Sequence, residues 1–101
     1  MDRVKTARKK NKMPRFIDVH RDMPEMPAEM VQEIKDRIAS GAKDEFGAVA
    51  VDVLAGNDGT AFCISDAPDA ASVVSSHTSK GVPLDAGDVH EVVSMGGKQL
   101  V

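Results

Sequence analysis

The order of its hydrophobic periodicities is the feature that most constrains this chain. Six segments follow one another as strand, helix, strand, strand, helix and strand. They cover residues 14–20, 27–42, 48–54, 60–65, 68–80 and 88–95. With right-handed crossovers, this order predicts a four-stranded antiparallel sheet with both helices on one face. The usual strand order of such a sheet is 4-1-3-2, so the first strand lies between the third and the fourth.

Local signals support these boundaries. In the first helical segment Val31, Ile34 and Ile38 recur at spacings of three and four, and Pro27 suits its first turn although it offers no side-chain cap. The linker 55–59 is rich in Gly, Asn and Asp, which tolerate the positive φ of hairpin turns. Gly81 follows the second helix as a stop signal. The βαββαβ order predicts an α+β fold of the ferredoxin-like type.

Composition limits how this fold can be stabilised. The chain has 101 residues, 42% of them hydrophobic, but only 3% aromatic with no Trp or Tyr. We therefore expect one small domain over residues 13–95 with a thin core, and a homodimer that covers the open face of the sheet. On that face we expect Phe16 and Ala61. The single cysteine, Cys63, excludes an intrachain disulfide and fits a reducing compartment, so we expect a cytoplasmic protein with no membrane partner.

The net charge of −3 conceals two regions of opposite sign. Residues 1–12 carry six Lys or Arg and one acid, whereas the remainder carries seven basic and fifteen acidic residues. A basic block with few apolar residues predicts a disordered arm over 1–12, and the glycine-containing end predicts a flexible tail over 96–101. The arm has no aromatic residue to stack a base and the body is acidic, which argues against a nucleic-acid partner.

Potential metal ligands converge at one end of the predicted sheet. Asp18 and His20 are two residues apart on the first strand, so they share a face about 6 to 7 Å apart. The end of this strand meets the starts of the third and fourth strands, near Cys63 and His90, and the second helix brings His77 toward the same end. We expect Cys63 on the open face beside Asp18 and His20. Each residue also has an ordinary structural interpretation, such as a solvated polar group or a small buried thiol.

The mixed nitrogen, sulfur and oxygen donors favour Ni, Zn, Co or Cu over Mg or Ca. Four methionines near the entry of the first helix, Met13, Met23, Met26 and Met30, are interpreted as core or interface residues. No orienting third group or oxyanion site accompanies Cys63, so we do not expect an enzyme. The alternative function is a dimeric small-molecule-binding or cofactor-free oxygenase-type protein without metal, which would need a sizeable apolar cavity.

Four segments carry a resemblance to a known family. They are Phe-Ile-Asp-Val-His-Arg-Asp-Met at 16–23, Phe-Cys at 62–63, Asp-Ala-Pro-Asp-Ala at 66–70 with Val73, Val74 and His77 after it, and His-Glu-Val-Val at 90–93. Over about residues 13–95 the chain resembles the small nickel-binding domain family. The resemblance implies a ferredoxin-like homodimer that binds nickel, and the prediction is therefore a nickel-binding protein with its site among Asp18, His20, Cys63, His77 and His90.

Overall fold

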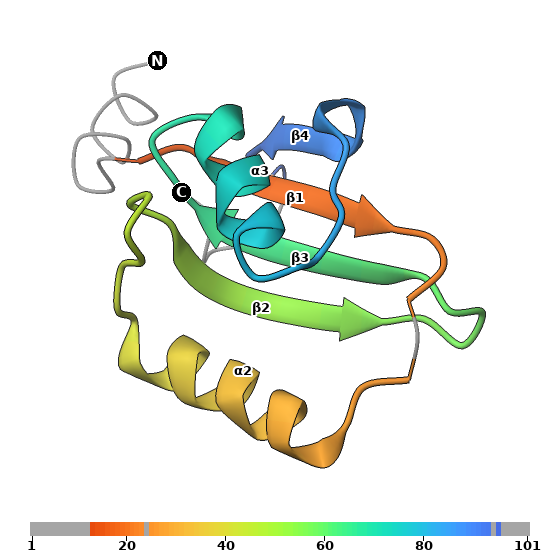
Figure 1. The fold of residues 1–101 in the computed structure, drawn as a ribbon. Helices are drawn as coiled ribbons and strands as arrows, with labels where there is room; N and C mark the ends of the chain where they lie inside the picture. The colour runs from red at the N-terminus through yellow and green to blue at the C-terminus, as the bar shows by residue number, and fades with distance from the viewer. Residues whose placement is uncertain (1–12, 24, 94, 96–101) are drawn as a thin grey trace.

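The computed structural model describes residues 13–23, 25–93 and 95. In this part of the chain, strands and helices follow one another in the predicted order, with a turn of 3-10 helix before the last strand. The elements are β1 Arg15–His20, α2 Ala28–Ser40, β2 Val49–Ala55, β3 Ala61–Asp66, α3 Ala70–Thr78, η1 Ala86–Asp88 and β4 Val89–Val92 (Figure 1). The predicted arm over 1–12 and tail over 96–101 lie outside the described residues.

The four strands form one antiparallel sheet in the order β2-β3-β1-β4, which confirms the predicted topology (Figure 1). Asp18 lies opposite Cys63 on β3 and opposite Val89 on β4. His20 lies opposite Ala61. The central position of β1 therefore brings residues from three strands together, as the topology predicted.

The helices are shorter than predicted because of their caps. α2 begins after Pro27, which has extended dihedrals and no side-chain cap, and it ends at Gly41 with a φ of +66°. α3 begins after Asp69, whose carboxylate accepts a hydrogen bond of 2.8 Å from the Ser72 amide. None of the helices in the described ranges is both long and apolar enough to cross a membrane.

The two faces of β1 are the reverse of our expectation. Along β1, Phe16, Asp18 and His20 are buried, while Ile17 and Val19 are only partly buried. The buried residues face the helices, because Phe16 packs with Val73 of α3 in the core. Phe16 and Ala61 were predicted on the open face and are instead 3% and 4% exposed on the helix side. That prediction was wrong.

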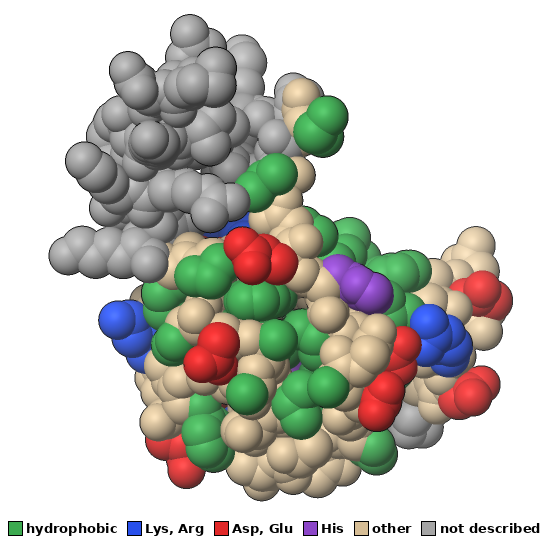
Figure 2. All heavy atoms as spheres, turned by 90° about the horizontal axis from the view of Figure 1, so that it is seen from above, with side chains coloured by type: hydrophobic (Ala, Val, Ile, Leu, Met, Phe, Trp, Pro, Cys, Tyr) green, Lys and Arg blue, Asp and Glu red, His purple; other side chains and the backbone are tan. Residues whose placement is uncertain are grey.

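The core is small and lies under α3. It consists of four buried residues, Phe16, Ala48, Ala67 and Val73, with Ala70, Leu84 and Val89 packed against them. α2 has no buried residue and lies beside β2 (Figure 1). The described surface seen from above carries acidic side chains scattered among hydrophobic ones and fewer basic side chains (Figure 2). The helix side of the sheet is therefore packed tightly only under α3.

Candidate metal centre

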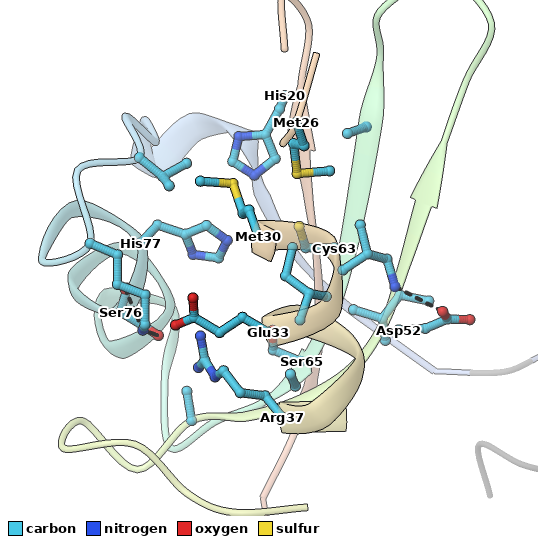
Figure 3. Close-up of a pocket in the computed structure, with 18 of the residues that line it drawn as sticks. His20, Met26, Met30, Glu33, Arg37, Asp52, Cys63, Ser65, Ser76 and His77 are labelled. Carbon is cyan, nitrogen blue, oxygen red and sulfur yellow. Dashed lines mark hydrogen bonds between the residues drawn. The ribbon is translucent and has the colours of Figure 1, made fainter. Parts of the chain in front are cut away.

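Four potential metal ligands meet between the sheet and α3. Asp18 and His20 come from β1, Cys63 from the neighbouring position on β3, and His77 from the last turn of α3. One ligand atom from each of them lies within 4.8 Å of the others. Figure 3 shows the His20 and His77 rings and the Cys63 sulfur pointing toward a common space. We refer to Asp18, His20, Cys63 and His77 as the four-residue cluster.

Asp18 is the innermost member of the cluster. Its side chain is fully buried, and its Oδ2 lies 2.6 Å from Nε2 of His20. Its other oxygen, Oδ1, is buried without a hydrogen-bond partner among the residues that the structure describes. Burying a carboxylate is costly unless its charge and lone pairs are compensated. A cation at the cluster would compensate both.

The hydrogen bonds of His77 fix its orientation and its tautomer. The carbonyl of Val73, which can only accept, lies 2.9 Å from Nδ1 of His77, so Nδ1 carries the donated proton. Nε2 of the same ring lies 3.2 Å from Oδ2 of Asp18. In the neutral imidazole, two lone pairs would face each other across this distance. A shared proton or a metal ion between these two atoms would make this contact favourable.

Two imidazoles therefore share one carboxylate oxygen. The His20 and His77 rings are tilted by 33°, with their centroids 5.2 Å apart. Backbone carbonyl support of an imidazole is the arrangement found around metal-ligating histidines, where it orients the ring and raises its basicity. His77 has this support from its own helix, so its ligating nitrogen is held toward the cluster.

Cys63 is a thiol rather than a thiolate when no metal is bound. Burial, together with the negative charge of Asp18, raises the pKa of Cys63 to about 12. A bound metal ion reverses this preference because it stabilises the thiolate directly. Metal binding at this cluster would therefore displace a proton from Cys63.

The donor set fits a transition metal ion, and the donor atoms lie within about 1 Å of the separations that such an ion needs. A tetrahedral ion with bonds of about 2.0 to 2.3 Å keeps its ligand atoms about 3.3 to 3.8 Å apart. In the structure the Asp18–His20 contact is shorter, at 2.6 Å, and the largest separation is within 4.8 Å. Shifts of about 1 Å would bring the four donors to bonding distance. Two nitrogens, one sulfur and one oxygen suit Ni, Zn, Co or Cu.

The fifth predicted ligand lies elsewhere. His90 is exposed on β4 and pairs with Ile17, so it lies on the open face of the sheet. Asp18, His20 and Cys63 were expected on that open face, and the structure instead places all three toward the helices. The reason is that β1 and β3 pair Asp18 with Cys63, and β1 turns the Phe16 side toward α3.

Sequence reasoning did not identify a cavity next to the cluster. It has a volume of about 270 Å³ and lies between α2, the sheet and α3. Among the residues that line it are Ser65 of β3 and Arg37 of α2 (Figure 3). Ser65 had a usable signal, because it lies two residues after Cys63 and therefore on the same face of the strand.

Comparisons with known proteins support the architecture. No protein-family model matches the chain, and a search of curated proteins found no match. The chain is similar in structure to the protein SCO4226 from Streptomyces coelicolor A3(2), known from a crystal structure, with a TM-score of 0.62 and 24% sequence identity. The similarity covers 81% of this chain and 99% of that one. At this level of identity the likeness shows the fold, which is the α+β ferredoxin-like arrangement.

Proposed function

We propose that this protein binds a first-row transition metal ion through Asp18, His20, Cys63 and His77. The observation that carries the proposal is the shared oxygen of Asp18, which faces two imidazole nitrogens while its second oxygen has no partner in the described residues. Nickel is the candidate that the family resemblance suggests, and the donor set equally suits Zn, Co and Cu.

Metal content decides between this proposal and a metal-free binding protein. Protein purified without a polyhistidine tag should take up one Ni²⁺, Co²⁺ or Zn²⁺ per chain in a calorimetric titration, and Mg²⁺ and Ca²⁺ should not compete. Elemental analysis after gel filtration measures the retained ion. Absence of any stoichiometric transition metal would instead favour the alternative, a small-molecule-binding protein that uses the cavity alone.

The affinity for metal is expected to rise steeply with pH. Because the pKa of Cys63 is raised to about 12, the thiol is protonated throughout the neutral range and must lose its proton when a metal binds. From this group alone, each unit of pH should raise the apparent affinity by about tenfold. Cobalt titrations at about pH 6.5, 7.5 and 8.5 measure the slope of the logarithm of the apparent affinity against pH. The slope should fall by about one unit in Cys63→Ala, and an unchanged slope would exclude thiolate ligation.

We further propose that the protein forms a homodimer through the open face of the sheet. The side chains on this face include Ile17, Val19, Phe62 and Ile64 in the two central strands, which the register places opposite one another. Leu54 of β2 pairs with Phe62 and is 47% exposed. An apolar sheet face of this kind is ordinarily covered by another layer.

Sedimentation equilibrium at micromolar concentration should give about twice the chain mass of 10.8 kDa. Leu54→Glu should shift the equilibrium toward the monomer because it places a charge in the contact. Met30→Glu is the matched control, since Met30 is 44% exposed but belongs to α2, away from the open face. A parent protein that sediments only at the mass of one chain would exclude this dimer.

A further inference from the structure

The cavity gives the candidate metal centre an open side. His20, Cys63 and His77 line the cavity, whereas Asp18 is fully buried behind them. An ion held by the cluster would have protein donors on one side and the cavity on the other. An ion held by all four donors can take a further ligand on this side by expanding from four to five ligands. At about 270 Å³, the cavity has the volume of about nine water molecules.

The cavity exists because α2 packs loosely. No residue of α2 is buried, although Ile34 and Met30 of this helix line the cavity. Met26, Val53 and Ala50 extend the same apolar wall. Figure 3 shows Met26 and Met30 between the helix and the two imidazoles. An occupant must therefore have an apolar middle section that replaces contacts α2 does not make with the sheet.

A second polar location lies in the cavity beyond the cluster. Ser65 is 8% exposed, and its hydroxyl has no hydrogen-bond partner among the described residues. Arg37 of α2 lines the same part of the cavity, and its guanidinium forms no ion pair within the described ranges. Figure 3 shows Ser65 and Arg37 on the side of the cavity away from His20. A hydroxyl donor and a guanidinium that line the same side of a cavity are suited to a carboxylate.

The other charges near this location are less available. Lys80 of α3 donates to the Ser76 carbonyl at 2.9 Å and lies 3.5 Å from the Asp44 carboxylate. Glu33 also lines the cavity, one helical turn before Arg37, and Figure 3 draws its carboxylate between Ser76 and the Arg37 guanidinium, although the two groups do not form an ion pair among the described residues. An incoming anion would compete with Asp44 for Lys80. Arg37 forms no ion pair among the described residues, so an anion can bind it directly.

The spacing of the two polar locations defines the length of the occupant. Cys63 and Ser65 are two residues apart on β3, which corresponds to about 7 Å. With carbon–carbon bonds of about 1.5 Å, two carboxylates at the ends of a chain of roughly four or five carbons span this distance. Resting on the proposed function, we infer that the metal centre binds a small dicarboxylic acid, with one carboxylate on the ion and the other at Ser65 and Arg37.

The test uses cobalt-loaded protein and two acids of equal chain length, succinate and butyrate. As its concentration rises, succinate should shift the visible absorption bands of the bound Co²⁺ until the shift reaches a plateau. Butyrate lacks the second carboxylate and should bind at least about tenfold more weakly. Arg37→Gln should weaken succinate by about tenfold and leave the Co²⁺ affinity unchanged. Lys35→Gln is the matched control, because it removes the same charge from an exposed position of α2.

The outcomes separate this inference from the proposed function. Cobalt titration without any acid is measured first, and failure of Co²⁺ to bind would overturn both. Normal cobalt binding with equal responses to succinate and butyrate, or with no response to either, would overturn the dicarboxylate site alone. The same conclusion would follow if Arg37→Gln and Lys35→Gln bound succinate equally well.

Discussion

His77→Ala is expected to lower the affinity for Ni²⁺ and Co²⁺ by at least about a hundredfold, because losses of this size are seen when only the partner of a metal ligand is removed. The ring of His77 is oriented by its own helix, because its Nδ1 donates to the Val73 carbonyl at 2.9 Å and leaves Nε2 directed at the cluster. The variant should still fold, since the ring is partly exposed and the buried residues of α3 are Val73 and Ser76. Isothermal titration with each metal measures the loss.

His90→Ala is the matched control for this experiment. It removes an identical side chain from the open face of the sheet, where His90 is exposed. We expect the metal affinity of this variant to equal that of the parent protein. Equal affinities of His77→Ala and the parent would mean that the cluster does not hold the ion. A loss confined to His90→Ala would place the site on the opposite face.

The topology of this protein could be predicted because its signals are local. Each strand and helix has its own periodicity, and the helices have their own end signals, such as Pro27 before α2 and Gly81 after α3. The order βαββαβ then leaves few arrangements of the sheet. The observed order β2-β3-β1-β4 is the predicted one. It places Asp18 opposite Cys63, as the site prediction required.

The facing of β1 could not be predicted from its own alternation. Both faces of this strand contain apolar residues, Phe16 on one and Ile17 with Val19 on the other, so the pattern alone does not identify the buried face. Because Ile17 and Val19 are both aliphatic, their face of the strand was expected to face the core. The structure instead buries Phe16 with Asp18 and His20, and their polar atoms pair with each other and with α3.

The position of His77 contained the information that decides this question. A residue on the inner stripe of a helix can meet only those strand residues that face the helices. Grouping His77 with Asp18 and His20 therefore required all of them to lie on the helix side, which contradicts the open-face assignment. The register also separates His90 from this group, since His90 lies opposite Ile17. Consistency between elements was a stronger constraint than the pattern of one strand.

The cavity had no counterpart in the sequence pattern. Val31, Ile34 and Ile38 form an ordinary amphipathic stripe, which predicts a helix packed on the sheet. In the structure none of them is fully buried. Apolar periodicity gives the direction in which a helix faces, but the closeness of its packing depends on the side chains opposite it. Here these include the small residues Ala50 and Ala61 and the polar cluster.

Cys63 of the folded, metal-free protein is expected to react with iodoacetamide at least about 30-fold more slowly than in the unfolded chain. At a pH near 8, raising the pKa from 9.0 to about 12 lowers the thiolate fraction by about a thousandfold. A thiolate of higher pKa is intrinsically more nucleophilic, which restores roughly a factor of 20. The net expectation is about 50-fold, and partial burial of the thiol slows the reaction further.

The pH dependence identifies the cause of this protection. Because the pKa of Cys63 is raised, its rate should keep rising as the pH increases through 9, whereas the rate in the unfolded chain levels off there. Mass spectrometry of the alkylated protein at a series of pH values gives both curves. Burial and the charge of Asp18 both raise this pKa, and Asp18→Asn removes the charge. The reaction rate of this variant should therefore increase, provided that its circular dichroism spectrum matches that of the parent protein. A folded protein whose rate levels off near pH 9 would show that Cys63 is not held as a thiol beside the Asp18 carboxylate.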